Sequence, residues 1–473
     1  MSKHVHAFGD DALGTMDATA IADAIKSKRL SVKEVVVATI TRAEKVNPQL
    51  NAITLKLYEN AENYHYLNRD SFFYGVPTFV KDNDDIKGYP TQHGTGVFIA
   101  KPAKKNSSFV NQMIFTGLNL IGKSTTPEFS LNCSTENEKW GITRNPWNTA
   151  YTPGGSSSGS GAMVASGVTA IAQANDGAGS TRIPAALCGL IGLKPSRERL
   201  VNHTGTHLLP INVVHEGVLT RSVRDTAAFY AEAEKYYKSS KLPSIGHVKD
   251  PIKKRLKVAF LNNRPEGEVG HVDADTFRVN METATLLESL GHHVEQIDFN
   301  IDLEEMMNLY LIYYGFLAFV QSDIGSVVYQ SKIDTKNLEP FTYGLANIFK
   351  RNILNFPKSI FALKSKIAKL ESDLFSRYDV LMLPVTSIQT PKIGYLSPLL
   401  SSKEIVRRSS TFAPFPGMQN VSGSPSISLP VGTDSNGLPL GLQFSAPLGQ
   451  DGLLLALAYE IEAAQPWKKI YTS

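Results

Sequence analysis

Apolar residues recur along the chain with two different periods, and each period predicts a kind of element. Helical spacing in residues 18–28 and 35–46 follows the capping residues Asp17 and Ser31, which predicts two amphipathic helices near the N-terminus. Residues 303–375 are mostly helical in pattern and unusually aromatic. Short apolar runs between turn residues predict strands at residues 72–80, 168–174, 257–261, 293–297, 379–385, 425–432 and 440–444.

The predicted strands and helices alternate. A strand, a helix over 274–290 and a second strand form a β-α-β unit, and Asn436-Gly437 between the last two strands is a hairpin signal. The pattern therefore predicts one α/β domain over residues 1–473, with a mixed, twisted β-sheet surrounded by helices. The aromatic residues of 303–375 have two readings, core packing or the lining of an apolar pocket.

Composition narrows the class of protein. The chain has 473 residues, 42% of them hydrophobic, and its 48 Lys and Arg against 44 Asp and Glu give a net charge of only +4. This slight bias does not favour nucleic acid or an anionic membrane as a partner. Only Cys133 and Cys188 are present, the first residues lack an apolar signal-peptide core, and apolar runs are too short to span a membrane. We expect a cytoplasmic protein, monomeric or homodimeric, that acts on a small molecule.

Two clusters of serine among glycines lie in residues 151–195, interleaved with apolar runs that a flexible linker would lack. The second cluster, Asp176-Gly177-Ala178-Gly179-Ser180, follows a predicted buried strand and precedes a helix that Pro184 suits in its first turn. Glycines and a helix N-terminus together present several backbone N–H groups to one point, which can stabilise an oxyanion. A tight turn with Ser180 as a simple helix cap is the alternative.

Lys81 directly follows the apolar residues Phe79 and Val80 at the end of a predicted strand. Burial would lower the pKa of its amine, and a fall of roughly three units from about 10.4 would let it act as a base near pH 7. The alternative is a strand-end lysine paired with Asp82.

Two short motifs suggest other chemistries but stand in the wrong context. Residues 117–124 match the phosphate-binding pattern GxxxxGK[ST], yet Leu118, Leu120 and Ile121 make the supposed loop a strand, and Pro127 interrupts the helix that should follow. Residues 155–159 match the GxSxG nucleophile elbow, but the preceding residues 145–153 read as loop rather than strand.

The histidines show no metal-binding pattern. His203 and His207 are four residues apart, but Gly205 between them argues against one helical face, and His292-His293 follows Gly291 at a turn. We therefore predict no metal and no cofactor.

Three segments in this order resemble the amidase signature family: Val80 to Asn83, the cluster Pro153 to Ser160, and Asp176 to Pro184. The similarity extends through residues 189–195 and 217–225 and into residues 420–447. It implies a signature core near 70–225, preceded by N-terminal helices in 1–69 and followed in 226–473 by specificity helices and the remaining strands.

The resemblance also implies an activity and the residues for it. An amidohydrolase of this family uses a Ser-Ser-Lys triad, with Ser180 as the nucleophile that forms an acyl-enzyme, Ser156 after a cis peptide as the bridge, and neutral Lys81 as the final base. The remaining implied residues are the oxyanion-hole amides of Gly177, Ala178, Gly179 and Ser180 and the supporting residues Ser157, Asp176 and Arg182.

This chain departs from the common family pattern at two positions. It has Asn175 where a threonine is more frequent, and Ala178 where a glycine is more frequent, which puts the amide geometry of the oxyanion hole in question. Asn175 to Ser180, with His215-Glu216-Gly217, resembles the branch of 6-aminohexanoate cyclic-dimer hydrolases.

The substrate stays open between linear and cyclic amides. Alternative functions are the glutaminase-like A subunit of a tRNA-dependent amidotransferase, a nucleotide-binding protein with a P-loop, and a catalytically silent scaffold.

Overall fold

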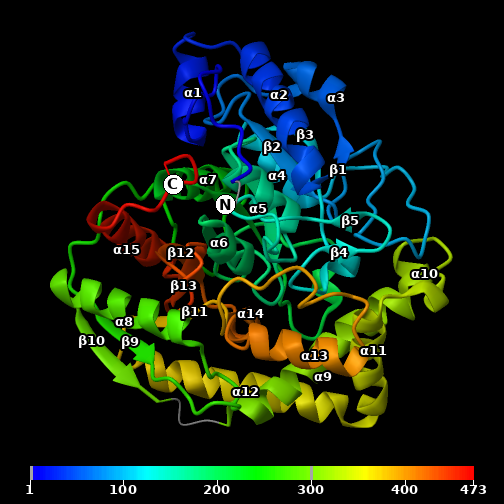
Figure 1. Ribbon diagram of the computed structural model, residues 1–473, viewed down its shortest axis with the longest axis vertical. Helices are drawn as coiled ribbons and strands as arrows, with labels where there is room; N and C mark the ends of the chain where they lie inside the picture. The colour runs from blue at the N-terminus through cyan, green and yellow to red at the C-terminus, as the bar shows by residue number, and fades with distance from the viewer. Residues whose placement is uncertain (1–3, 299–301, 473) are drawn as a thin grey trace.

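A computed structural model describes residues 4–298 and 302–472, and a mixed sheet of eight strands runs through its centre (Figure 1). The strand order is β10-β9-β11-β13-β12-β7-β8-β6. Strands β10, β9 and β11 run parallel to one another, and the other neighbours pair antiparallel. The bounds are β6 Ile171–Asp176, β7 Ile191–Lys194, β8 His215–Thr220, β9 Lys257–Leu261, β10 His293–Ile297, β11 Val380–Pro384, β12 Ser426–Thr433 and β13 Pro439–Ser445.

A separate three-stranded sheet, in the order β1-β3-β2, lies beside the β6 edge and contains Lys81. Its strands are β1 Ile53–Lys56, β2 Pro77–Lys81 and β3 Asn119–Ser124. The main chain of Lys81 donates a hydrogen bond of 2.6 Å to the side chain of Gln173 on β6, which joins the two sheets. A short hairpin adds β4 Glu136–Asn137 and β5 Gly141–Ile142.

Helices surround these sheets. The first seven are α1 Ala18–Lys26, α2 Val32–Leu50, α3 Tyr58–Glu62, α4 Ser108–Phe115, α5 Ser158–Ala165, α6 Arg182–Cys188 and α7 Val223–Tyr236. The others are α8 Ala274–Ser289, α9 Leu303–Ser322, α10 Gly325–Val328, α11 Pro340–Arg351, α12 Phe356–Phe375, α13 Ser402–Phe412, α14 Gly417–Ser422 and α15 Asp451–Ala464. Short 3-10 turns occupy Tyr64–Tyr66, Glu128–Ser130, Thr206–Leu208, Thr335–Asn337 and Ile353–Asn355.

The first helices begin where the sequence pattern predicts. Asp17 accepts a hydrogen bond from the backbone of Ala20, and Ser31 with Glu34 forms a complete capping box. The N-terminal region is not wholly helical, however, because β1 lies within residues 1–69 and pairs with β3. Sequence inspection missed this strand because it has only four residues and its partner lies far along the chain.

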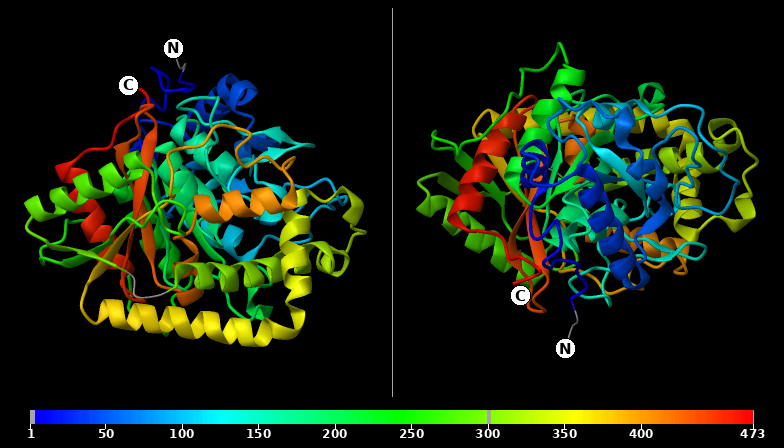
Figure 2. Two further views of the ribbon diagram at one scale, coloured as in Figure 1. Left: turned by 60° about the horizontal axis from the view of Figure 1, so that its bottom comes forward. Right: turned by 90° about the horizontal axis from the view of Figure 1, so that it is seen from above.

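The aromatic segment forms a helical layer at the opposite end of the molecule from α1 and α2 (Figures 1 and 2). Helix α9 packs against α11 and α12, and α13 packs against α11. A separate apolar cluster there buries Tyr313, Leu363 and Phe415, so part of the aromatic segment packs as core.

Helix length and composition also bear on membrane insertion. Among the helices in the described part of the chain, none has the length and continuous apolar character needed to cross a membrane.

Candidate active site

Lys81 ends β2 with its side chain completely buried. Its Nζ atom donates hydrogen bonds to Ser156 Oγ at 2.7 Å and to Asn175 Oδ1 at 2.8 Å. Burial lowers the pKa of Lys81 to about 7, while the more distant charges of Glu216, Asp176 and Asp84 act in the opposite direction. A buried amine with neutral hydrogen-bond partners and a pKa near 7 is available as a base at physiological pH.

Asn175, a departure from the common family pattern, belongs to this centre. Its side-chain amide also pairs reciprocally with that of Asn83, at 3.1 and 3.2 Å. This pairing orients Oδ1 of Asn175 towards the lysine. Sequence inspection noted the unusual asparagine but missed its contact, and the available signal was its place on the strand that leads to Ser180.

The first serine cluster places Ser156 against the lysine. The peptide bond between Gly155 and Ser156 is cis, and Ser156 is buried. The hydroxyl of Ser157 is also buried, and it has no hydrogen-bond partner among the described residues. Ser158 begins α5 and donates from Oγ to the carbonyl of Gly154 at 2.5 Å.

Ser180 lies in the turn between β6 and α6, as the sequence predicts, and retains 8% exposure. Gly179 adopts a positive φ of 112°, a region that favours glycine. Its backbone N–H is already donated to Asp176 Oδ1 at 2.7 Å. Within the described residues, the N–H groups of Gly177, Ala178 and Ser180 have no such partner, so these three are the amides available to a ligand.

Asp176 and Arg182 stabilise this turn through buried hydrogen bonds. Arg182 forms two hydrogen bonds with the carboxylate of Asp176, at 2.9 and 3.0 Å, and both side chains are fully buried. Burial alone would raise the pKa of Asp176, but the charge and hydrogen bonds of Arg182, with a bond from Asn420, hold it below its usual range. The carboxylate also accepts from the backbone of Thr181, so it fixes the start of α6.

Behind Lys81 lies a cluster of Asp84, His203 and Glu216 whose ligand atoms lie within 4.8 Å of one another. His203 Nδ1 lies 2.6 Å from Glu216 Oε1, and Gln173 donates to both carboxylates at 2.9 and 3.0 Å. Burial would lower the pKa of His203, but the two carboxylates raise it to about 10. These contacts join the three side chains and Gln173 in one largely buried network.

The two competing motifs have different surroundings. Residues 119–124 of the phosphate-loop pattern form β3, and Lys123 pairs with Asp82 at 2.8 Å instead of facing an open loop. Asp82 therefore does not pair with Lys81. The elbow pattern at 155–159 does not follow a strand, as its proline-containing flank predicted.

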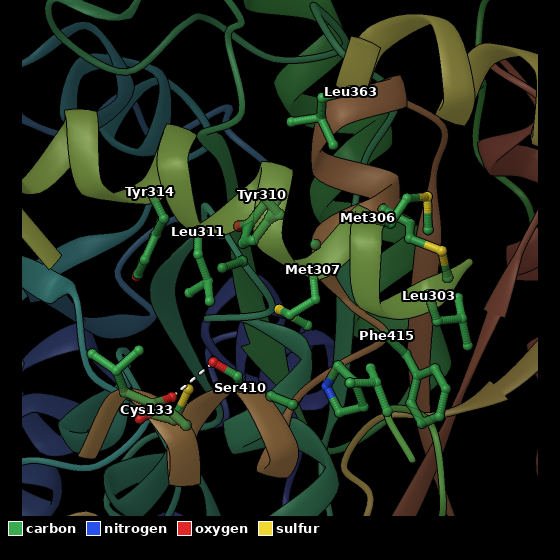
Figure 3. A pocket seen from close by; sticks show the side chains of 18 of the residues that line it. Cys133, Leu303, Met306, Met307, Tyr310, Leu311, Tyr314, Leu363, Ser410 and Phe415 are labelled. Carbon is green, nitrogen blue, oxygen red and sulfur yellow. Dashed lines mark hydrogen bonds between the residues drawn. The ribbon is translucent and has the colours of Figure 1, made fainter. Parts of the chain in front are cut away.

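A cleft opens beside the Ser180 turn and encloses about 830 Å³, including the part that opens to solvent. Ala178 and Cys133 line it, and α9 forms a wall with Met306, Met307 and Tyr310 (Figure 3). Part of the aromatic segment therefore lines a cavity, while Tyr313 of the same helix is core.

The fold is that of an α/β protein with a large mixed sheet surrounded by helices. Comparison with known sequences gives the family: residues 34–455 match the amidase family, and the chain belongs to it.

Relatives match over nearly the whole length. The provisionally named amidase AmiC of Mycobacterium tuberculosis is 43% identical over 471 residues, which cover 99% of this chain and 98% of that protein. The 6-aminohexanoate-cyclic-dimer hydrolase of Paenarthrobacter ureafaciens is 33% identical over 500 residues, with 95% of each chain covered.

Solved structures agree with these relatives. A 6-aminohexanoate cyclic dimer hydrolase in complex with its substrate superposes with a TM-score of 0.85 at 30% identity, covering 96% of this chain and 97% of that one. A bacterial aryl acylamidase of the amidase signature family shares the fold, with a TM-score of 0.84 at 24% identity and coverage of 97% of this chain and 98% of that one.

Proposed function

We propose that the protein hydrolyses a small-molecule amide through an acyl-enzyme on Ser180, with Ser156 and Lys81 as the proton relay. The observation that carries this proposal is the environment of Lys81. Its amine is buried, contacts Ser156 directly, and has a pKa of about 7. A serine hydroxyl is a weak nucleophile at neutral pH and needs an adjacent proton acceptor of this kind.

The relay moves one proton in each half of the reaction. As Ser180 Oγ attacks the amide carbonyl, its proton passes to Ser156, and the Ser156 proton passes to the neutral amine of Lys81. The resulting ammonium returns a proton through Ser156 to the departing nitrogen, and the C–N bond breaks. Water then repeats the attack on the ester, which releases a carboxylic acid and restores Ser180.

The backbone amides of Gly177, Ala178 and Ser180 are our candidates for the oxyanion hole. The amide of Gly179 is excluded from this role because Asp176 occupies it. Its contribution is indirect: the bond fixes the turn that carries the other three amides, and Arg182 holds the carboxylate in place. Loss of one such donor typically costs about 100- to 1000-fold in rate.

Ser157 is a further candidate for a supporting role, since its buried hydroxyl lies next to Ser156 in the chain. The reaction needs neither a cofactor nor a metal in this scheme. Similarity to the cyclic-dimer hydrolases favours an amide of related size, linear or cyclic, over the reaction of an amidotransferase subunit.

Labelling with a serine-directed fluorophosphonate tests the nucleophile. We expect a single adduct on Ser180, mapped by peptide mass spectrometry, and no adduct in Lys81→Ala protein. Turnover of a simple anilide should be lost in Ser180→Ala and only reduced in Ser157→Ala, because Ser157 has at most a supporting role in this scheme. An adduct on Ser157, or full activity of Ser180→Ala, would replace this scheme with the elbow interpretation.

A further inference from the structure

The cleft borders the loop that carries Ser180, and one of its lining residues packs on the loop that carries Ser156. Ala178 lies two residues before the proposed nucleophile and lines the cleft. Cys133 lines it too, and its backbone packs on the other loop so closely that a Cβ at Gly155 would lie 2.7 Å from the Cys133 carbonyl carbon. A group that fills the cleft would therefore contact Ala178 of the Ser180 loop and Cys133, which packs on the Ser156 loop.

Helix α9 ties the cleft to the same turn. The hydroxyl of Tyr310 donates to the carbonyl of Gly177 at 3.2 Å, and its ring packs on Gly417. The ring of Tyr314 stacks on that of Tyr310, with centroids 5.8 Å apart. The wall of the cleft and the proposed oxyanion loop are thus one connected structure.

The lining offers apolar surface and almost no free polar group. Among the described residues that line the cleft, none has an ionisable acidic or basic side chain of the Asp, Glu, Lys, Arg or His type. The hydroxyl of Tyr314 is donated to the Leu131 carbonyl at 2.7 Å, and that of Ser410 to the Val406 carbonyl at 2.7 Å (Figure 3). The hydroxyl of Ser409, which also lines the cleft, has no hydrogen-bond partner among the described residues. The rest of the lining offers mainly rings and methylene groups to a ligand, and a charged ligand group would stay unpaired there.

Two methionines, Met306 and Met307, are consecutive residues of α9 and both line the cleft (Figure 3). Their unbranched side chains adapt to ligands of different shape.

We propose that this cleft binds an extended, uncharged, apolar group attached to the scissile amide, so that the substrates are amides with such a chain and not charged amides such as glutamine. This inference rests on the proposed function, because it takes the reacting carbonyl to lie at Ser180. The shared chemistry is the apolar chain, and two substrate series decide whether it belongs to the acyl or the amine side.

The first experiment measures kcat/KM for both series on the unaltered protein. One series holds the p-nitroaniline leaving group and lengthens the acid from acetyl to decanoyl, and the other holds acetyl and lengthens an n-alkylamine. We expect one series to rise about fourfold per methylene until the cleft is full, from about 0.8 kcal/mol per buried CH₂. Hydrolysis of acetyl-p-nitroanilide with no rise in either series would overturn the proposal and leave the proposed function intact.

A binding measurement separates the cleft from the chemistry. Calorimetric titration of Ser180→Ala protein with decanamide and acetamide should show at least tenfold tighter binding of decanamide. Equal affinities would contradict the cleft assignment even if turnover were never observed. Preserved decanamide binding, together with no hydrolysis of either substrate series by the unaltered protein, would instead count against the catalytic scheme alone.

Neighbouring positions on α9 provide matched variants. Met307 lines the cleft, whereas Asn308 is exposed and does not. Met307→Trp should lower the ratio of kcat/KM for long over short chains at least tenfold, and Met307→Glu should do so as well by placing an unpaired charge in the cleft. Asn308→Trp should leave the ratio unchanged. The ratio is independent of how much protein folds, and equal ratios in all three variants would refute the assignment.

Discussion

Lys81 and Lys123 lie on the neighbouring parallel strands β2 and β3, and both side chains are fully buried. Lys123 is held by Asp82 at 2.8 Å, with Thr91 and the Pro90 carbonyl as further partners. Among the described residues, the hydrogen-bond partners of the Lys81 Nζ atom are the neutral side chains of Ser156 and Asn175. The same residue type, at the same depth, is thus an ion-pair partner in one place and a candidate base in the other.

The strand geometry explains the difference. Val80 is the register partner of Lys123, and Lys81 is the partner of Ser124. Because successive residues on a strand point to opposite faces, Lys81 and Asp82 cannot share a face, while Asp82 and Lys123 can. A carboxylate directly beside an amine favours its charged form, and neutral partners do not. A buried lysine can therefore act as a base only where the neighbouring carboxylate points to the other face of the strand.

The largest expected effect is on activity. Lys81→Met should lower kcat/KM by about 100- to 10,000-fold, which is the usual contribution of a general base. Lys123→Met should stay within tenfold of the unaltered protein once corrected for the folded fraction. Steady-state kinetics on a simple anilide checks both. If Lys123→Met alone abolished activity, the roles of the two lysines would have to be exchanged.

The two variants should have the opposite order of effects on stability, with the larger loss in Lys123→Met. Lys123→Met leaves the buried carboxyl of Asp82 without its cation, which should lower the free energy of unfolding by about 3 kcal/mol. Lys81→Met removes an amine whose burial costs roughly 4 kcal/mol near neutral pH, at about 1.36 kcal/mol per pKa unit. It also leaves Ser156 and Asn175 with fewer partners, so its stability should be close to or above that of the unaltered protein.

Urea denaturation of the three proteins at pH 7 measures this contrast. A greater loss of stability in Lys81→Met than in Lys123→Met would show that the two environments do not differ as described.

The pH dependence tests the lysine pKa directly. Only neutral Lys81 accepts a proton, so kcat/KM should fall about tenfold per pH unit below a pKa of about 7 and level off above it. The folded protein also binds fewer protons at Lys81 than the unfolded chain between pH 7 and about 10.4, so this group makes stability increase with pH across that window. An activity profile that rises only near pH 10 would contradict the lowered pKa.

The smallest expected effect is a shift of that profile. Asn175→Asp places a carboxylate beside Lys81, as Asp82 lies beside Lys123. The acidic limb of the profile, where kcat/KM falls, should move to higher pH by about one unit. Activity at high pH should recover. Asp82→Asn, the matched change at the other lysine, should leave the limb in place. A shift in Asp82→Asn equal to that in Asn175→Asp would indicate a general electrostatic effect instead of a direct contact.

Local patterns predicted much of the fold and part of the site. The strand end at Lys81, the turn at Ser180, the β-α-β unit of β9, α8 and β10, and the hairpin at Asn436-Gly437 all follow from nearby residues, and the structure contains each of them. The match of residues 34–455 to the amidase family confirmed the family assignment. That assignment could be made from the sequence because the family's motifs are short and contiguous. The triad roles stay a prediction.

What local patterns missed depends on distant partners. The amide of Gly179 looked available in the sequence, but the side chain of Asp176 takes it. Asn175 stood out in the sequence only as a polar departure from the family pattern, and its contact with Lys81 exists because β6 lies beside β2. β1 was not predicted because a short strand is recognisable mainly by the strand it pairs with, and its partner β3 is remote in sequence.

The sequence by itself determined where strands become turns and helices, and which serines, glycines and lysines stand at those points. Backbone propensity and hydrophobic period act over a few residues, so these features can be read in order along the chain. Only the tertiary structure decided which lysine meets a carboxylate, which amides stay free and which aromatic residues face a cavity. Those outcomes depend on register and on packing between segments remote in sequence, and a single residue of register reverses the face to which a side chain points.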